Sequence, residues 1–488
     1  MKSIFPLLLL FTVQLWSQVE ITNIVHQSNN GQSIGSGFAV VAEAEAGFSI
    51  FFVDGKKIYA NGFDGDYNYL SRLDSREISS REEYIAGKSY GDNYHLFFKV
   101  RVLDKLLVQT FNFTKDTVTE NLIPLDIRDQ EILQYFEHDN KVNLLTVGTK
   151  QDVLFLHSID ENFETSSQKI PIDAYVFYNE KHNKRPFHKV IFDNFQEISG
   201  IGMNPSQATF PMTLPESTRP TKIYKQENQL VFTLDASPQL TQVLYVDIET
   251  GETSLKNIQK VSPAAEKSVK QSNSFLLDKE LYQIVRRDDV LEISVKNSET
   301  GDLLNTFELS DGEEFPYTNT ATLTLKPSKK KRKEVSPSQF LRFAKYDPLG
   351  IYATNVDGAT QITYGTWDKE RGNNGSLNNS KGNGAMVGVM TVSFGIVGGI
   401  LYAALSSGNS IQSYGLHHVG MTTRAIGVFD KNFQHLPDKG VQANIYHRID
   451  YYNSKQEDTT PFLLFQFKDT TIYGSFYPEQ NAVKLLKF

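Results

Sequence analysis

The chain has 488 residues, of which 40% are hydrophobic and 22% charged, enough apolar material for one large repeat fold or two to four smaller domains. The formal net charge of −8 argues against general nucleic-acid binding, because a protein that binds phosphates needs a basic face. The absence of cysteine excludes disulfides, thiol catalysis, cysteine-ligated zinc and lipid attachment through an N-terminal cysteine. An aromatic content of 12% favours β-strands, whose pleated surfaces accommodate Phe and Tyr.

The first residues, MKSIFPLLLLFTVQLWSQ, have the pattern of a signal peptide that resembles the leaders of exported bacterial proteins. Lys2 supplies the positive start, residues 4–15 form a short apolar stretch, and Ser17 is the small residue at the expected cleavage site. A retained membrane anchor is the weaker alternative, because the apolar stretch is short. We therefore expect residues 1–17 to be removed and residues 18–488 to be periplasmic, associated with the outer membrane, or extracellular.

Two similar phrases indicate a repeated β-hairpin, LYVDIETGETSLKNI at residues 244–258 and ISVKNSETGDLLNTF at residues 293–307. Gly251 and Gly301, 50 residues apart, would supply the positive φ of each turn. The other expected hairpin turns are Asp54-Gly55, Lys115-Asp116, Glu161-Asn162, Asp357-Gly358, Lys431-Asn432 and Glu479-Gln480. Most neighbouring turns are about 45 to 60 residues apart, which is the period of propeller blades.

On these repeats the chain resembles β-propeller proteins, and we expect an all-β propeller of about seven blades over residues 18–488. The interval between Asn162 and Gly251 leaves room for an extra, less regular blade, and residues 126–140 fit either a short helix or the entry to a strand. The alternative architecture is two or three β-sandwich domains, which also have short strands and regular turns. The even spacing of the turns favours the propeller.

One segment does not fit a regular blade: residues 385–405, AMVGVMTVSFGIVGGILYAAL, contain no charge. Gly/Asn/Ser-rich linkers flank the segment, so we interpret residues 372–411 as an insertion near the C-terminus. As a helix the segment would be about 31 Å long, close to the ~30 Å hydrocarbon core of a bilayer. A membrane span would separate residues 406–488 from the rest of the ring. The remaining alternatives are an element that contacts a membrane or an envelope protein, and buried strands or an internal helix.

Two groups of residues follow from this interpretation. The expected membrane or partner contacts are Met386, Val387, Val389, Met390, Phe394, Ile396, Ile400, Leu401 and Tyr402. The phrase KPSKKKRKEV contributes a basic loop of Lys329, Lys330, Lys331, Arg332 and Lys333. In an exported acidic protein this loop is first a solvated connection, and second a contact for anionic lipid headgroups.

Motifs of catalysis and metal binding are weak. Asp64, Asp66 and Asn68 place oxygen ligands at alternate positions, as calcium loops do, but Tyr69 and Ser75 stand where a full loop has Gly and Glu. We therefore keep Ca²⁺ as a weak candidate and expect no other cofactor. Residues 31–35, GQSIG, match a nucleophile elbow, but a strand rather than a helix is expected to follow. The histidines, including His182, His188, His417 and His418, do not have a zinc spacing.

No catalytic site is recognised in the sequence, so the expected function is a binding or assembly module of the cell envelope. One alternative is a hydrolase or lyase with its site at the propeller axis, which would need acids, His or Arg from several blades around one pocket. A second alternative is a structural envelope protein that associates with itself through the Gly-rich segment.

Overall fold

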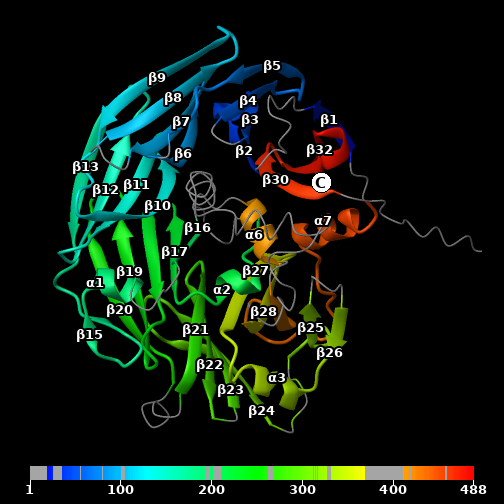
Figure 1. The fold of residues 1–488 in the computed structure, drawn as a ribbon. Helices are drawn as coiled ribbons and strands as arrows, with labels where there is room; N and C mark the ends of the chain where they lie inside the picture. The colour runs from blue at the N-terminus through cyan, green and yellow to red at the C-terminus, as the bar shows by residue number, and fades with distance from the viewer. Residues whose placement is uncertain are drawn as a thin grey trace, which may run out of the picture.

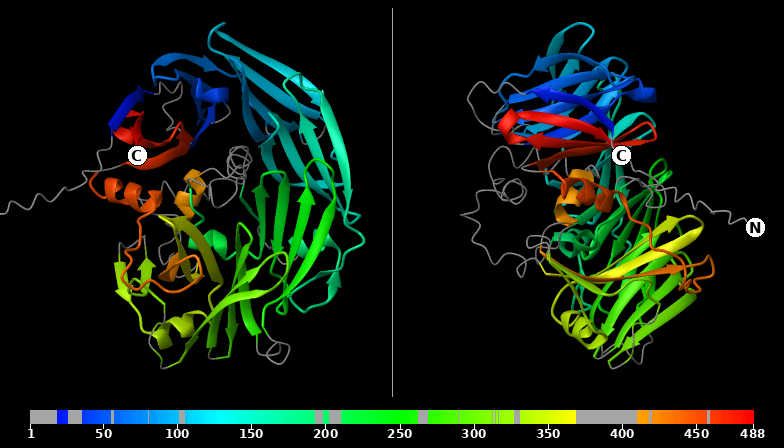
Figure 2. Two further views of the ribbon diagram at one scale, coloured as in Figure 1. Left: turned by 180° about the vertical axis from the view of Figure 1, so that it is seen from behind. Right: turned by 90° about the vertical axis from the view of Figure 1, so that its right-hand side faces the viewer.

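The computed structural model describes residues 19–488 apart from residues 26–35, 55–56, 80, 101–104, 193–197, 202–209, 262–268, 289, 312, 314, 316, 327–330, 369–409, 418–419 and 457–458. Within these residues, seven sheets of four or five strands and one two-stranded sheet are present. The seven larger sheets stand around a common axis (Figure 1), and Figure 2 shows the same ring from behind and from the side. The described chain is a seven-bladed β-propeller rather than two or three β-sandwiches.

Blades 1 to 3 are regular antiparallel meanders, each with its first strand nearest the axis. Blade 1 is β2 (Ser36–Val41), β3 (Gly47–Asp54), β4 (Lys57–Asp64) and β5 (Tyr69–Asp74), with the 3-10 turn η1 (Glu43–Glu45). Blade 2 is β6 (Glu82–Tyr90), β7 (Asn93–Val100), β8 (Lys105–Asn112) and β9 (Thr117–Pro124). Blade 3 is β10 (Gln130–His138), β11 (Lys141–Gly148), β12 (Val153–Ile159) and β13 (Thr165–Pro171).

Blade 4 begins after an excursion through the small sheet of β14 (Phe177–Tyr178) and β15 (Lys184–Arg185) and through α1 (Phe187–Phe192), and α2 (Leu214–Ser217) lies between its first two strands in the chain. Its strands are β16 (Ile198–Ile201), β17 (Thr221–Gln226), β18 (Gln229–Leu234), β19 (Leu240–Asp247) and β20 (Thr253–Gln259). The described part of the interval from Asn162 to Gly251 thus holds the end of blade 3, this excursion and blade 4, not an extra blade.

Blades 5 to 7 complete the ring. The two outer strands of blade 6 come from the segment before its innermost strand, and the outer strand of blade 7 comes from the start of the chain. Blade 5 is β21 (Val269–Leu277), β22 (Glu280–Arg287), β23 (Val290–Asn297) and β24 (Leu303–Ser310). Blade 6 is β27 (Leu349–Val356), β28 (Ala359–Asp368), β29 (Met421–Phe429), β25 (Leu323–Lys326) and β26 (Lys331–Glu334), with α3 (Pro337–Phe343) before β27. Blade 7 is β30 (Thr460–Phe467), β31 (Thr470–Tyr477), β32 (Ala482–Lys487) and β1 (Val19–Val25), with the 3-10 turn η5 (Pro478–Gln480).

The ring is closed by pairing the first strand of the chain with the last. β1 runs antiparallel to β32, from Val19 opposite Lys487 to Val25 opposite Ala482. Closure of this kind joins the two ends of a propeller through backbone hydrogen bonds and covers the outer edge of β32.

The predicted hairpins are confirmed, since each predicted turn lies between strands or bridge partners that pair with one another, although Gly55 itself lies outside the described residues. Gly251 and Gly301 have φ values of 73° and 81°, the conformation that only glycine adopts without strain. Residues 130–138 form strand β10, which decides between the two interpretations of that stretch.

The hydrophobic core lies between neighbouring blades. Four apolar clusters join blades 1 to 3, blades 3 and 4, blades 4 to 6, and blades 7 and 1. Between blades 6 and 7 the arrangement differs, because α6 (Ser410–His417) and α7 (Ile445–Asn453) pack against the strands of blade 7. Among the described helices, none is long and apolar enough to cross a membrane.

Candidate functional site

Blade 6 carries a long insertion at one end. In the other six blades, the connection between the second and third strands is two to five residues long, whereas β28 ends at Asp368 and β29 begins at Met421. The pairing of β28 with β29 is continuous from Thr360 opposite Phe429 to Asp368 opposite Met421. Residues 369–420 are therefore added to an otherwise regular hairpin, at what we call the insertion end of blade 6.

The basic loop emerges at this same end. Strand β25 pairs with both β26 and β29, so Arg332 is opposite Leu325, and Leu325 is opposite Thr422. Thr422 is in turn opposite Trp367, next to the root of the insertion at Asp368. Three strand spacings separate Arg332 from Trp367, which is roughly 14 Å. The register thus places Arg332 at the same end of blade 6 as Trp367 and Thr422, close to the two points where the insertion leaves and rejoins the hairpin.

Part of the basic loop is described in side-chain detail. Arg332 and Lys333 are exposed on β26, the edge strand of blade 6. Within the described residues, neither of them forms an ion pair with a carboxylate, so both charges are available to an anionic surface. Lys331 begins β26, while Lys329 and Lys330 lie outside the described residues. All the expected contacts between Met386 and Tyr402 also lie outside them.

The C-terminal root of the insertion is held by the helix α6. Tyr414 of α6 is buried with Tyr446 and Ile449 of α7 and with Tyr473 of β31. The Ser413 hydroxyl donates a hydrogen bond of 2.5 Å to Glu216, which belongs to the capping box of α2. The described C-terminal part of the insertion is therefore a helix that packs against α7 and blade 7 and bonds to α2.

Polar groups meet around α6 and α7. The Tyr414 hydroxyl donates to Asp450 at 2.8 Å, and His417 Nε2 lies 3.6 Å from the same carboxylate. Arg424 of β29 donates to His447 Nε2 at 2.9 Å, and burial together with the Arg424 charge lowers the pKa of His447 to about 3. His447 is therefore a neutral acceptor at physiological pH. These contacts connect blade 6 to the two helices.

His417 is the last residue of α6, and His418 lies outside the described residues.

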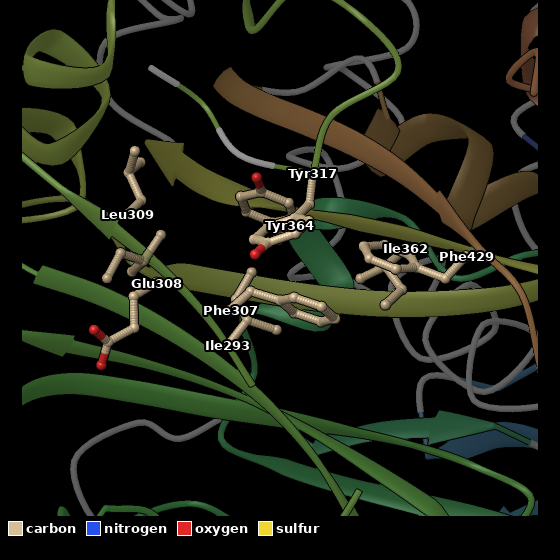
Figure 3. A pocket seen from close by; sticks show the side chains of 9 residues that line it. Ile293, Phe307, Glu308, Leu309, Tyr317, Ile362, Tyr364 and Phe429 are labelled. Carbon is tan, nitrogen blue, oxygen red and sulfur yellow. The ribbon is translucent and has the colours of Figure 1, made fainter. Parts of the chain in front are cut away.

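A small apolar pocket lies between blades 5 and 6 (Figure 3). It is lined by Leu291, Ile293, Phe307, Glu308, Leu309, Tyr317, Ile362, Tyr364 and Phe429. The lining contains one carboxylate, two phenols and no histidine, lysine or arginine. Most of the lining is hydrophobic, so the pocket suits contact with an apolar group.

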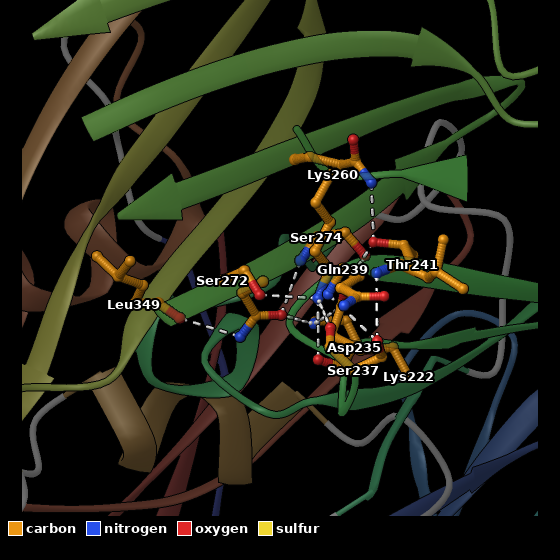
Figure 4. A network of polar contacts seen from close by, with 12 residues as sticks. Lys222, Asp235, Ser237, Gln239, Thr241, Lys260, Ser272, Ser274 and Leu349 are labelled. Atoms are coloured by element: carbon orange, nitrogen blue, oxygen red, sulfur yellow. Dashed lines mark hydrogen bonds and ion pairs between the residues drawn. The ribbon is translucent and has the colours of Figure 1, made fainter. Parts of the chain in front are cut away.

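A buried ionic network links the inner strands of blades 4, 5 and 6 (Figure 4). Asp235 lies 3.4 Å from Lys260 Nζ and 4.0 Å from Lys222 Nζ, and all three side chains are 0% exposed. Lys222 donates to Asn273 at 2.6 Å, and Asn273 donates to the carbonyl of Leu349 at the start of β27. Burial lowers the pKa of Lys222 to about 8 and also lowers the pKa of Lys260. The network holds the inner strands together and is sealed from substrates.

The weak calcium candidate forms a self-contained loop at the end of β4. Asp64 accepts hydrogen bonds from the backbone N–H groups of Asp66 and Asn68 and from the side-chain amide of Asn68. The hydrogen bonds from Asn68 are the main reason that the pKa of Asp64 is lowered. These donors occupy the carboxylate, and Ca²⁺ at this loop stays a prediction.

The remaining sequence candidates have structural contacts or are not described. His182 stacks on Tyr178 and shares a hydrogen bond with Ser237. His188 of α1 is buried, with Nε2 3.4 Å from Glu131. Ser33 of the GQSIG motif lies outside the described residues.

Comparison with known proteins adds no family. No family model and no curated protein matches the chain. Among solved structures, the Dos1 propeller is similar over 97% of this chain and 94% of its own, at 9% identity and a TM-score of 0.32. The subtype N10 neuraminidase-like protein of A/little yellow-shouldered bat/Guatemala/060/2010 is similar over 70% of this chain and 94% of its own, at 7% identity and a TM-score of 0.27. The SapL1 lectin is similar over 70% and 92%, at 8% identity and a TM-score of 0.22. The fold is established by the sheet order itself.

Proposed function

We propose that this protein is an exported binding module of the cell envelope, which contacts an anionic membrane surface through the insertion end of blade 6. The observation that carries the proposal is the register that joins Arg332, Leu325, Thr422 and Trp367 in one row across four neighbouring strands. It brings the described part of the basic loop to the end of blade 6 at which an insertion begins, and this insertion contains the uncharged apolar segment about 50 residues later in the sequence.

Two weak signals side by side are what reversible membrane association requires. A single apolar element gives marginal binding, and a basic patch beside it supplies the second contribution. Each Lys or Arg near an anionic surface contributes about 1 kcal/mol, so the five residues of the loop would contribute up to about 5 kcal/mol at low salt. The apolar segment would add the burial of uncharged side chains, at about 25 cal/mol per Å².

The competing functions have less support in the described residues. The pocket between blades 5 and 6 is lined mainly by hydrophobic side chains, and the buried lysine network is closed. Docking on an envelope protein would use the same apolar segment, so an experiment is needed to distinguish it from membrane contact. Self-association would be distinguished from both by the molecular mass of the protein in solution.

The test is flotation of the mature chain, residues 18–488, with vesicles that contain or lack anionic lipid. One variant deletes residues 373–405, which leaves eight linker residues between β28 and α6. A second variant changes all five residues of the basic loop to Gln. The matched control changes two lysines beyond the opposite end of β29, the exposed Lys431 and the half-buried Lys439, to Gln.

We expect the intact chain and the control to float with anionic vesicles, and both insertion-end variants to stay with the soluble fraction while melting as folded proteins. Flotation of the folded deletion variant would contradict the proposal. No flotation of the intact chain would also contradict it, and would leave an envelope protein as the partner. Concentration-dependent mass that the deletion removes would instead favour the structural protein.

A further inference from the structure

Three potential metal ligands meet at the end of the propeller opposite the insertion end. His138 and Asp139 lie at the turn between β10 and β11 of blade 3, and Glu249 lies in the turn between β19 and β20 of blade 4. The nearest imidazole nitrogen and carboxylate oxygens of the three residues all lie within 4.8 Å of one another. The group therefore spans two neighbouring blades, at a distance from the membrane contact proposed above and independent of it.

The His138 ring has an unused nitrogen in this group. Its side chain is 11% exposed, and its Nε2 atom is buried without a hydrogen-bond partner in the described structure. The same atom lies 3.6 Å from the Asp139 carboxylate. A buried ring nitrogen without a partner costs free energy, so a ligand at this position would remove the cost.

The corresponding hairpin in blade 5 shows which residues occupy the equivalent positions of that blade. Asp247 and Asn297 cap the two Glu-Thr-Gly turns in the same way, each accepting hydrogen bonds from the backbone N–H groups two and three residues later. Ile248, the residue after Asp247, donates its N–H to the carbonyl of Asn228 at 2.8 Å. In blade 5, Ser298, the residue after Asn297, donates its N–H to the carbonyl of Lys279 at the same distance. Asn228 and Lys279 are therefore equivalent positions.

The two hairpins differ in charge at this position. In blade 5, the Lys279 ammonium lies 3.0 Å from Glu299 and neutralises it. In blade 4, the Asn228 amide donates to Glu249 at 2.7 Å but carries no charge. Within the described residues, no Lys or Arg pairs with Glu249 or Asp139. Two carboxylates and an imidazole thus face a point where blade 5 has a cation.

We propose that His138, Asp139 and Glu249 bind one divalent transition-metal ion that joins blade 3 to blade 4. An imidazole nitrogen with two carboxylate oxygens suits Zn²⁺ or Mn²⁺, whereas Ca²⁺ prefers oxygen ligands alone. The ion takes the place of the Lys279 ammonium and satisfies His138 Nε2. Water would complete the coordination, and the role of the site is to hold the two blades together.

The test uses untagged residues 18–488, stripped with a chelator and titrated with Zn²⁺ by calorimetry, with thermal unfolding in parallel. His138→Gln and Glu249→Gln each remove a ligand, and Glu299→Gln removes the equivalent carboxylate of blade 5 as the matched control. Asn228→Lys places the ammonium of blade 5 into blade 4. Its fold should be retained, because Lys279 occupies the equivalent position in blade 5.

We expect the wild type and Glu299→Gln to bind one equivalent of Zn²⁺ and to gain thermal stability from it. The two ligand variants should bind at least about tenfold more weakly. Asn228→Lys should lose the same binding event without losing stability in the metal-free state. The proposal is overturned if the wild type has no such event, or if His138→Gln and Asn228→Lys bind Zn²⁺ as the wild type does.

Discussion

The buried lysine network predicts a large difference between two substitutions of similar size. Asp235 is the one carboxylate within 4 Å of the Lys222 and Lys260 ammonium groups among the described residues. Asp235→Asn would keep the shape of the side chain and leave two buried ammonium groups without a counter-charge. Removing one partner of a buried ion pair costs about 3 to 5 kcal/mol.

Lys222→Met has the opposite effect on the charge balance. It leaves Asp235 and Lys260 as a neutral pair and removes the cost of burying a second ammonium group. The losses are the hydrogen bonds from Lys222 to Asn273 and to the carbonyl of Arg219, each worth about 1 kcal/mol. We therefore expect Asp235→Asn to destabilise the protein by at least about 2 kcal/mol more than Lys222→Met.

Urea unfolding at pH 7, with the midpoint and slope fitted for each variant, measures this difference. Equal free energies of unfolding for the two variants, at unchanged slopes, would refute the reasoning. That result would mean that the ammonium groups are neutral or hydrated in the folded protein, and that Asp235 does not act as their counter-charge.

Three further predictions follow from the same structure. Burial lowers the pKa of Lys222 in the folded state to about 8 from 10.5, so between these pH values the folded state binds fewer protons than the unfolded state. The free energy of unfolding of the wild type, measured by urea melts relative to Lys222→Met, should therefore rise from about pH 7 to about pH 9.5. A chain that starts at residue 27 lacks β1 and leaves the edge of β32 uncovered, so it should be less stable by circular dichroism and aggregate on size exclusion, unlike residues 18–488. Phe462 packs over Gly37 between blades 7 and 1, so Phe462→Ala should cost about 3 to 5 kcal/mol of unfolding free energy, and a cost below about 1 kcal/mol would show that the contact does not hold the ring.

The architecture could be predicted from the sequence because the turns are local. Gly251 and Gly301 mark the same turn in two consecutive blades, and their separation gives the period. The turns at Gly358 and Gln480 connect different pairs of strands within their blades. The even spacing of the turns therefore predicted the number of blades better than the residues at which each blade begins and ends.

The sites depend on contacts between blades, which the sequence does not reveal. Strand β25 precedes the other strands of blade 6 in the chain and joins them at the outer edge of the sheet, and only this pairing brings Arg332 to the end of the blade at which the insertion begins. Lys222, Asp235 and Lys260 come from separate segments of blade 4, and His138 and Glu249 from two blades. For the proposed metal site, the signal in the sequence was the internal repeat, in which Asn228 occupies the position that Lys279 occupies in the next blade.

The most direct test of the central claim uses the absence of cysteine, which allows one dye to be attached at one chosen position. An environment-sensitive fluorophore on Ser393→Cys would report on the apolar segment, and the same dye on Lys431→Cys on the opposite end of blade 6. With anionic vesicles, we expect a blue shift and an intensity gain at position 393 and no change at position 431. An unchanged spectrum at position 393, or equal shifts at both positions, would contradict membrane contact through the insertion end.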